Sequence, residues 1–300
     1  MFFLNSAVPY LFIIPALVLI YALVAKQRTA LIATFIPAIL FLGLYGARFQ
    51  PRPPAATPPA AITIMTHNLN AFNDDTGALR DLTIREGVDV LFLQELGRWI
   101  QPITPKDLEE SLPNSIINPT HNLYGMGIFS RFPLREVPAP ELAPFSQHTQ
   151  AAILTHPTGD LLVVNIHNIS VSLEGPSFPE KIRQEMAERQ AVAEATLALI
   201  ERLNLPTIVA GDFNSTEFSR THARYEEALV DVWDAKGSGF GHTFPGGPVR
   251  PHVLGIPSPE WYVRIDYIFV SLTMSVEEAR IGYWNGMSDH RPVVAVVTPP

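Results

Sequence analysis

The sequence predicts an α/β domain with stacked sheets, preceded by a pair of apolar helices. Three observations indicate this class. The first 60 of the 300 residues contain no Asp or Glu, and a proline-rich stretch closes this part of the chain. Beyond it, strand-like and helix-like patterns alternate to the end. The length is sufficient for one large domain and an accessory segment.

The accessory segment contains two uncharged apolar stretches, at 9–25 and 30–47. Each approaches the roughly 17–25 residues that span a bilayer as a helix. We therefore expect residues 1–49 to form a two-helix transmembrane hairpin, with helices at about 8–25 and 30–47. A cleaved signal peptide and a pair of buried soluble helices are the alternatives. The segment lacks the basic start and the evident cleavage site of a signal peptide.

The turn between the two stretches carries Lys26 and Arg28, and basic residues favour the cytoplasmic side of a membrane. This predicts a multi-pass protein of the inner or plasma membrane, with its globular domain on the extracytoplasmic side. Arg48 and Arg52 favour the opposite orientation. Residues 50–60 are rich in proline, which indicates a stiff linker, so that the globular domain covers 61–300.

The globular domain is acidic. Four of the 21 Lys and Arg residues lie in the first 60 positions, so 17 basic residues face 29 acidic ones, a formal charge of −12. A surface that binds extended nucleic acid is normally basic, and the composition therefore disfavours such a surface. Local basic groups can still bind a single phosphate. The absence of cysteine excludes disulfides and thiolate metal sites.

Strands are expected where β-branched and aliphatic residues form short runs bounded by polar residues. An amphipathic helix is expected at 181–203 and a shorter one at 76–87. The stretch 234–260 is rich in glycine and proline, and we expect either a functional loop or a solvated excursion. The expected strands are 62–68, 89–93, 161–166, 207–210, 265–270 and 292–297.

Short polar motifs close most of these apolar runs or lie next to them. Carboxylates, carboxamides and histidines at strand ends are the groups that hold a hard divalent cation and act on a phosphate. Together the motifs point to a metal-dependent phosphoesterase. They are His67-Asn68-Leu69-Asn70, Gln94-Glu95, Asn165-Ile166-His167-Asn168, Gly211-Asp212-Phe213-Asn214, Arg264-Ile265-Asp266-Tyr267 and Ser288-Asp289-His290.

One motif supplies candidate groups for proton transfer and charge stabilisation. Asp212 and Asn214 are two residues apart and point the same way on an extended chain. Asp212 can orient or deprotonate an attacking water, and Asn214 can donate to phosphate oxygens as charge builds. Read alone, such a motif is equally typical of a simple turn.

Other motifs supply candidate metal-site residues. Glu95 follows a buried strand run, where a carboxylate can bind Mg²⁺, although a salt bridge is the alternative for this residue alone. Asn68 and Asn70 share one face of the first strand and are candidates to hold the metal or its waters. Asp289 is a candidate to bind the metal directly or through water.

Asp266 lies within an aromatic strand, where an unpaired charge is costly. We therefore expect it to accept a hydrogen bond from an imidazole, either that of His290 or that of His167. A structural ion pair is the alternative. His290 can act on the phosphate or on the water, and His167 is a candidate to stabilise the phosphate in the transition state.

These motifs, in this order, resemble those of the endonuclease/exonuclease/phosphatase superfamily. That superfamily includes pancreatic-type deoxyribonucleases, abasic-site endonucleases, inositol-polyphosphate 5-phosphatases and neutral sphingomyelinases. The resemblance covers about residues 61–298. It implies a four-layer α/β sandwich, in which helices flank two packed mixed β-sheets. It also implies Mg²⁺-dependent hydrolysis of a phosphoester, with Mn²⁺ as an alternative metal.

The resemblance further implies roles for individual residues. It leaves open whether Asp212 or His290 is the general base. Asn70 departs from the acidic residue that some nucleases carry there. The implied metal-site residues are Asn68, Glu95 and Asp289, with support of a histidine as the alternative role of Asp289. The implied catalytic residues are His167, which contacts the phosphate, Asp212 and Asn214, which act on the water and the transition state, and Asp266, which orients His290. Arg183 and Gln190 lie where an Arg and a Gln recur in the helix after the histidine motif, and Gly127–Arg131 resembles the family's strand that ends in Ser-Arg.

The substrate class stays open between nucleic acid and a phospholipid head group. The hairpin favours a lipid, because it keeps the site at a high effective concentration near a bilayer. Two readings without catalysis are the alternatives: an inactive binding module with the same fold, and a membrane scaffold whose hairpin is the functional part.

Overall fold

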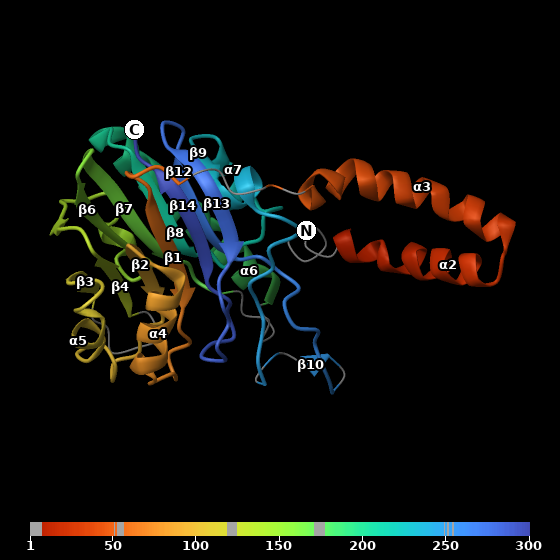
Figure 1. The fold of residues 1–300 in the computed structure, drawn as a ribbon, viewed down its shortest axis with the longest axis horizontal. Helices are drawn as coiled ribbons and strands as arrows, with labels where there is room; N and C mark the ends of the chain where they lie inside the picture. Colours follow the sequence, from red (N-terminus) through yellow and green to blue (C-terminus); the bar gives the residue numbers. More distant parts are fainter. Residues whose placement is uncertain are drawn as a thin grey trace.

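The computed structural model describes residues 8–50, 52, 57–118, 125–170, 178–248, 250, 252–253 and 255–300. Of the linker expected at 50–60, residues 51 and 53–56 lie outside the described residues. Within them, the chain folds into two sheets with helices on their outer faces, and two further helices project from one side (Figure 1).

Two six-stranded sheets form the centre of the domain (Figure 1). Both are mixed, because β1 pairs with β2 and β7 pairs with β8 in parallel, whereas the other pairs are antiparallel. In spatial order the first sheet contains β13 (Ser275–Ile281), β14 (Val293–Thr298), β1 (Ile62–Asn68), β2 (Val90–Gln94), β4 (Met126–Ser130) and β3 (Asn114–Asn118). The second contains β5 (Leu134–Glu136), β6 (Thr149–His156), β7 (Gly159–His167), β8 (Thr207–Asp212), β12 (Asp266–Ser271) and β9 (Leu229–Asp231).

The sheets enclose one core, and helices cover their outer faces. Ile64, Phe92 and Val163 are among the buried residues between the sheets. The helices α4 (Thr76–Glu86) and α5 (Thr104–Leu108) pack on the first sheet, and α6 (Phe178–Leu203) and α7 (Arg220–Glu226) pack on the second. Two short elements, α8 (Val232–Lys236) and η2 (Ala143–Phe145), lie between strands of the second sheet along the chain or directly after them. The predicted four-layer α/β sandwich is confirmed.

Local sequence signals explain where the predicted elements begin and end. Asp75 caps α4, since its side chain accepts a hydrogen bond from the Ala78 amide, and Gly87 ends the helix in the left-handed conformation. The strands expected from apolar runs are present within one to two residues at most ends. The edge strand β13 was not predicted, because its sequence Ser-Val-Glu-Glu-Ala-Arg-Ile is half-exposed and charged.

The N-terminal helices fit the predicted hairpin in position. The helices α2 (Ile13–Val24) and α3 (Arg28–Tyr45) lie side by side, and the 3₁₀ turn η1 (Gly46–Phe49) continues α3 (Figure 1). The helical stretch Arg28–Phe49 has 22 residues and contains an 18-residue window with a mean hydropathy of 2.1, so by length and composition it is able to cross a membrane. The apolar stretch Val8–Val24 is shorter.

The base of this hairpin packs against the globular domain. The ring of Phe240 lies 5.5 Å from that of Tyr45 and 5.3 Å from that of Phe49. The Gly239 amide donates to the carbonyl of Arg48 at 2.7 Å, and the Arg48 guanidinium lies 3.4 Å from the Asp234 carboxylate. The two parts are therefore joined by side-chain packing as well as by the covalent linker.

The glycine- and proline-rich stretch 234–260 is largely irregular. Its regular part beyond α8 is the two-stranded ribbon of β10 (His252–Val253) and β11 (Ile256–Pro257). The stretch is held to the domain next to Asp289, because the Gly246 amide donates to the Asp289 carbonyl at 2.8 Å. This contact places part of the stretch beside Asp289. The structure therefore favours the expected functional loop over a solvated excursion.

Candidate active site

The strand ends that carry the polar motifs meet at one edge of the two sheets. Parallel pairing brings together the carboxyl ends of β1 and β2, and likewise those of β7 and β8. The antiparallel strand β12 begins at Asp266, directly opposite Asp212, and β14 begins shortly after His290. The residues gathered there are those predicted from the sequence: Asn68, Glu95, His167, Asp212, Asn214, Asp266, Asp289 and His290.

Gly211 allows the strands that carry His167 and Asp212 to approach closely. Its φ is 149°, and a Cβ placed there would lie 1.9 Å from the carbonyl oxygen of Ile166. No other residue fits this position without moving a strand. The motif Gly-Asp-x-Asn is thus a strand end with a steric requirement for glycine, and His167 lies opposite Asp212 in the parallel register.

Asp212 occupies the centre of the cluster and is almost fully buried. Its Oδ2 accepts hydrogen bonds from the side-chain amides of Asn68 at 3.1 Å and Asn214 at 3.2 Å, and its Oδ1 accepts from the Asn214 backbone amide at 2.8 Å. Burial raises the pKa of the Asp212 carboxyl to about 7, against the opposing effect of these hydrogen bonds and of His290. A carboxylate with such a pKa is suited to accept a proton near neutral pH.

Asp266 pairs with His290, which decides between the two histidines left open by the sequence. The Nδ1 of His290 lies 2.9 Å from Oδ2 of Asp266, and its Nε2 faces Oδ2 of Asp212 at 3.9 Å. Burial lowers the pKa of His290, but the charges of Asp266 and Asp212 outweigh burial and raise it to about 10. His290 is therefore held in its protonated, hydrogen-bond-donating form.

Glu95 and His167 form the adjoining part of the site. One oxygen of Glu95 accepts from the Asn68 side chain at 3.1 Å and lies 3.7 Å from Nε2 of His167. Its other oxygen accepts from the Ala71 amide at 3.1 Å. The Glu95 side chain is 26% exposed, so it reaches the surface of the cluster. Burial, followed by the neighbouring histidines, lowers the pKa of His167 to about 3, which keeps its ring neutral.

Asp289 is connected to the cluster through Asn70. The side-chain amide of Asn70 donates to Oδ1 of Asp289 at 3.1 Å, and the Asn70 backbone amide donates to the side chain of Asn68 at 2.9 Å. Among the described residues, Asp212, Asp266 and His290 have potential ligand atoms within 4.8 Å of one another. We do not regard this trio as the metal centre, because Nδ1 of His290 already pairs with Asp266, and a hard cation prefers the more accessible oxygens of Glu95.

Two asparagines link the loops of the site to each other and to the core. The amide of Asn168 donates to the carbonyl of Asp212 at 2.9 Å, and the carbonyl of Asn168 accepts from the Asn214 side chain at 2.8 Å. Below them, Gln94 donates to the Asn165 side chain at 2.7 Å, across the space between the two sheets. These buried bonds fix the relative positions of the motifs that carry Glu95, His167 and Asp212.

One arginine beside the candidate site was not singled out from the sequence. The predicted Arg183 is exposed, and Gln190 bonds to Glu194 on the same helix. Instead, the buried Arg189 donates from Nε and Nη2 to the carbonyl of Ile169, at 2.9 and 2.7 Å. Spacing along α6 would have revealed this residue, because a buried row at intervals of four runs through Glu185, Arg189, Ala193 and Leu197.

A cleft of about 430 Å³ opens beside the cluster, and Asn70 and Asp289 form part of its wall. Other parts of the wall come from Asp74 and Asp75 in the loop after β1 and from Gly246 within the glycine-rich stretch. Among the lining residues that the structure describes, three are aspartates and none is Lys or Arg. This cleft is the candidate position for the part of a substrate next to the reacting phosphate.

Comparison with known proteins identifies the fold. One solved structure is the 3′ phosphatase NExo from Neisseria bound to a product DNA hairpin, with a TM-score of 0.58 and 20% identity, over 78% of this chain and 98% of that one. Another is truncated TDP2 from Caenorhabditis elegans, with a TM-score of 0.57 and 17% identity, over 79% and 97%. A third is an endonuclease/exonuclease/phosphatase from Beutenbergia cavernae, with a TM-score of 0.56 and 19% identity, over 80% and 72%.

Sequence comparison agrees with the structural one. No curated protein matches the chain. The model of the Endonuclease/Exonuclease/phosphatase family matches residues 65–290, which include the six polar motifs. The name of the family covers endonucleases, exonucleases and phosphatases, and the strand ends of this chain carry acidic, amide and imidazole groups. The chain therefore belongs to the endonuclease/exonuclease/phosphatase family.

Proposed function

We propose that the protein is a membrane-anchored, Mg²⁺-dependent phosphodiesterase that hydrolyses its substrate by in-line attack of water. The observation that carries the proposal is the convergence of Asp212 with the His290–Asp266 pair on one side and Glu95 on the other. This arrangement unites a proton acceptor, a charged donor and a candidate metal ligand at one sheet edge.

The residues present fit a hard divalent cation. The side-chain nitrogen of Asn68 lies 3.1 Å from oxygens of both Glu95 and Asp212, so two carboxylates converge on one small region. Burial raises the pKa of the Asp212 carboxyl, and a cation bound beside it would favour its ionised form. Glu95 and Asn68 would hold the ion, with Asp289 acting directly or through water. When bound, Mg²⁺ supplies Lewis-acid stabilisation of the phosphate, and Mn²⁺ is an alternative metal.

The protein's own groups divide the remaining work. His290 is held protonated by Asp266, so its role is to donate to the phosphate rather than to accept a proton. Asp212, with a pKa of about 7, is the better general base. Asn214 donates to phosphate oxygens as charge builds, and the neutral ring of His167 contacts the phosphate.

We further propose the domain organisation expected from the sequence: a hairpin at 1–49, a linker at 50–60 and a catalytic domain at 61–300. The apolar side chains of Ile14, Leu17 and Ile36 are 67%, 60% and 68% exposed, which suits contact with lipid. The basic turn at Lys26 and Arg28 supports an inner- or plasma-membrane, multi-pass arrangement with the catalytic domain outside the cytoplasm.

A phospholipid head group is the favoured substrate. The acidic walls of the cleft repel a polyanion, and the hairpin holds the site near lipid. Nucleic acid is the rival, because the NExo neighbour has DNA bound and shares the fold.

The substrate class is tested by supplying both candidates to the full chain reconstituted in vesicles. We expect Mg²⁺-dependent release of head groups from sphingomyelin-containing vesicles, and no release by an Asp212→Asn twin. Nicking of plasmid DNA that disappears in the twin would instead establish an anchored nuclease. Silence on both substrates by folded protein would remove the lipid assignment and favour an inactive binding module or a scaffold.

The metal assignment is tested by Glu95→Gln. This change keeps the size of the side chain but removes the charge that holds the ion, so we expect the Mg²⁺ concentration for half-maximal activity to rise about 10- to 100-fold. Glu136→Gln, on the exposed edge strand β5, is the matched control and should leave the titration unchanged. Superimposable Mg²⁺ curves for Glu95→Gln and the wild type would show that Glu95 is not a ligand.

A further inference from the structure

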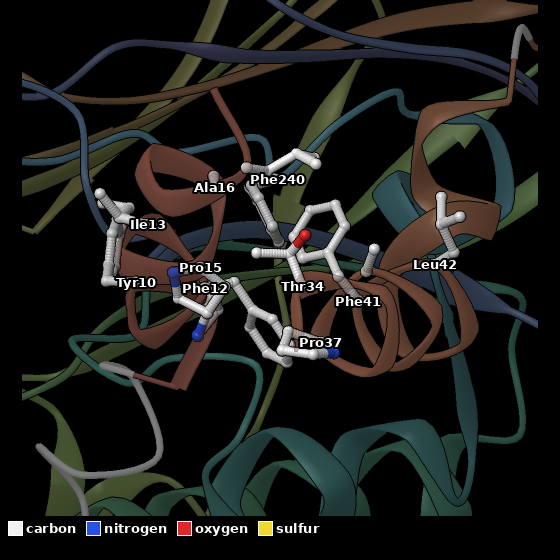
Figure 2. Close-up of a pocket in the computed structure, with 13 residues that line it drawn as sticks. Tyr10, Phe12, Ile13, Pro15, Ala16, Thr34, Pro37, Phe41, Leu42 and Phe240 are labelled. Atoms are coloured by element: carbon white, nitrogen blue, oxygen red, sulfur yellow. The ribbon is translucent and has the colours of Figure 1, made fainter. Parts of the chain in front are cut away.

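A cleft of about 510 Å³ lies between the two helices of the hairpin (Figure 2). Its described lining residues are apolar apart from Tyr10 and Thr34, and the Thr34 hydroxyl is occupied by a hydrogen bond to the carbonyl of Leu31 at 2.9 Å. One lining residue, Phe240, comes from the globular domain rather than from the hairpin. The cleft thus offers almost no polar group to a ligand.

The sequence explains why the helices do not close this space. Pro37 lies inside α3, where a proline disturbs the backbone and the packing around it, and Pro15 lies in the first turn of α2; both line the cleft. Ala16 and Ala38 also line it, and their small side chains leave room. The separation is therefore built into both helices at the same level of the hairpin.

The cleft's surroundings point to its occupant. On both helices the side chains next to it are apolar and exposed, such as Ile13 at 52% and Leu42 at 64%. Water in an apolar cavity lacks hydrogen-bond partners. A second helix is about 10–12 Å wide with its side chains, too wide to enter a space of this volume between two helices. We infer that the cleft binds one acyl chain of a bilayer phospholipid, an inference that rests on the membrane anchoring proposed above.

The position of Phe240 connects this site to the catalytic cluster. Its ring stacks on that of His242 at 5.3 Å, and the Thr243 hydroxyl accepts from the Ile265 amide at 3.2 Å. The ring of Phe244 then lies 4.7 Å from that of His290. Four residue steps extend at most about 14 Å, so the end of the cleft and the catalytic histidine are bridged by a single short segment. An acyl chain bound here places its phospholipid close to the active site.

The test uses the full chain in phosphatidylcholine vesicles that contain a phospholipid with a photoreactive group on its acyl chain. After irradiation, we expect cross-links to peptides that contain the cleft-lining residues, including Phe240. Phe240 is diagnostic because it belongs to the globular domain. Ala16→Trp and Ala38→Trp fill the cleft and should each reduce the Phe240 cross-link about tenfold, which corresponds to about 1.4 kcal/mol. Ala33→Trp is the matched control, since Ala33 is exposed on α3 and does not line the cleft.

Each outcome bears on the acyl-chain site separately from the proposed catalysis. Cross-links confined to outward-facing hairpin residues, or a Phe240 cross-link that survives both cleft-filling variants, would overturn it. Co-sedimentation of each variant with the vesicles confirms anchoring, and loss of co-sedimentation by the wild type would refute the anchor itself. Because the readout is a cross-link, an inactive enzyme that still labels Phe240 in the expected pattern would refute the phosphodiesterase proposal and leave the lipid site standing.

Discussion

Asp212→Asn should lower the turnover number about 10²- to 10⁴-fold, the contribution typical of a positioned general base. The change preserves the shape of the side chain but removes its ability to accept a proton from water. Asp212 also receives hydrogen bonds from Asn68 and Asn214 and faces His290 at 3.9 Å, so the substitution alters the centre of the cluster. Initial rates at saturating Mg²⁺, on whichever of the two candidate substrates is hydrolysed, provide the measurement.

The matched control is Asp160→Asn. Asp160 is partly exposed and pairs with Arg135 on the second sheet, outside the cluster, so activity should be unchanged. Far-UV circular dichroism and the melting temperature should show that Asp212→Asn folds. A folded Asp212→Asn protein that keeps most of its turnover would exclude Asp212 as the base. In that case His290 would become the candidate, despite the charge of Asp266 that favours its protonation.

Arg264→Met should destabilise the domain by about 3–5 kcal/mol, the usual consequence of leaving a buried charge without its partner. Arg264 is 1% exposed, and its Nη1 donates to Oδ2 of Asp231 at 2.7 Å. The same oxygen of Asp231 bonds to Nε2 of His222 at 2.9 Å, and Oδ1 accepts from the Trp233 amide. Methionine fills similar volume but leaves the carboxylate with less positive charge. Urea unfolding of a fragment covering residues 58–300 gives the free energy of unfolding.

Two further variants separate lost pairing from lost packing. Arg135→Met removes an exposed pair with Asp160 and should cost no more than about 1 kcal/mol. Asp231→Asn combined with Arg264→Met removes the unpaired charge and should recover part of the loss. If Arg264→Met alone unfolds at the wild-type urea concentration, the buried pair contributes nothing to stability.

The sequence was most informative about strand ends. Each candidate residue from Asn68 to His290 follows or precedes an apolar run, and an apolar run bounded by polar residues is a local signal of a buried strand. Parallel strands then place their carboxyl ends at one edge, so the gathering of Glu95, His167 and Asp212 followed from local patterns. The family resemblance rested on the same motifs and is confirmed by the match over residues 65–290.

The tertiary structure decided which side chains these residues pair with. The motif Arg264-Ile265-Asp266-Tyr267 reads as one unit, yet Arg264 pairs with Asp231 and Asp266 pairs with His290. Alternate residues of an extended chain point to opposite sides, and only the neighbouring strands decide what each meets. The same holds for α6, where the direction of the helix face selects Arg189 and leaves Arg183 exposed.

The N-terminal hairpin most clearly separates what local sequence determines from what contacts between distant residues determine. Its length and lack of charge mark an apolar helical segment from composition alone, because the spacing of charged residues along the chain is a local property. Its docking on Phe240 and the cleft between its helices are not local, since Phe240 lies about 200 positions away in the sequence. Contacts between such distant residues form only when the sheets fix the loops in space. The sequence by itself therefore determined which residues form the candidate site and the apolar hairpin, and the tertiary structure decided how each side chain is paired and how the hairpin meets the globular domain.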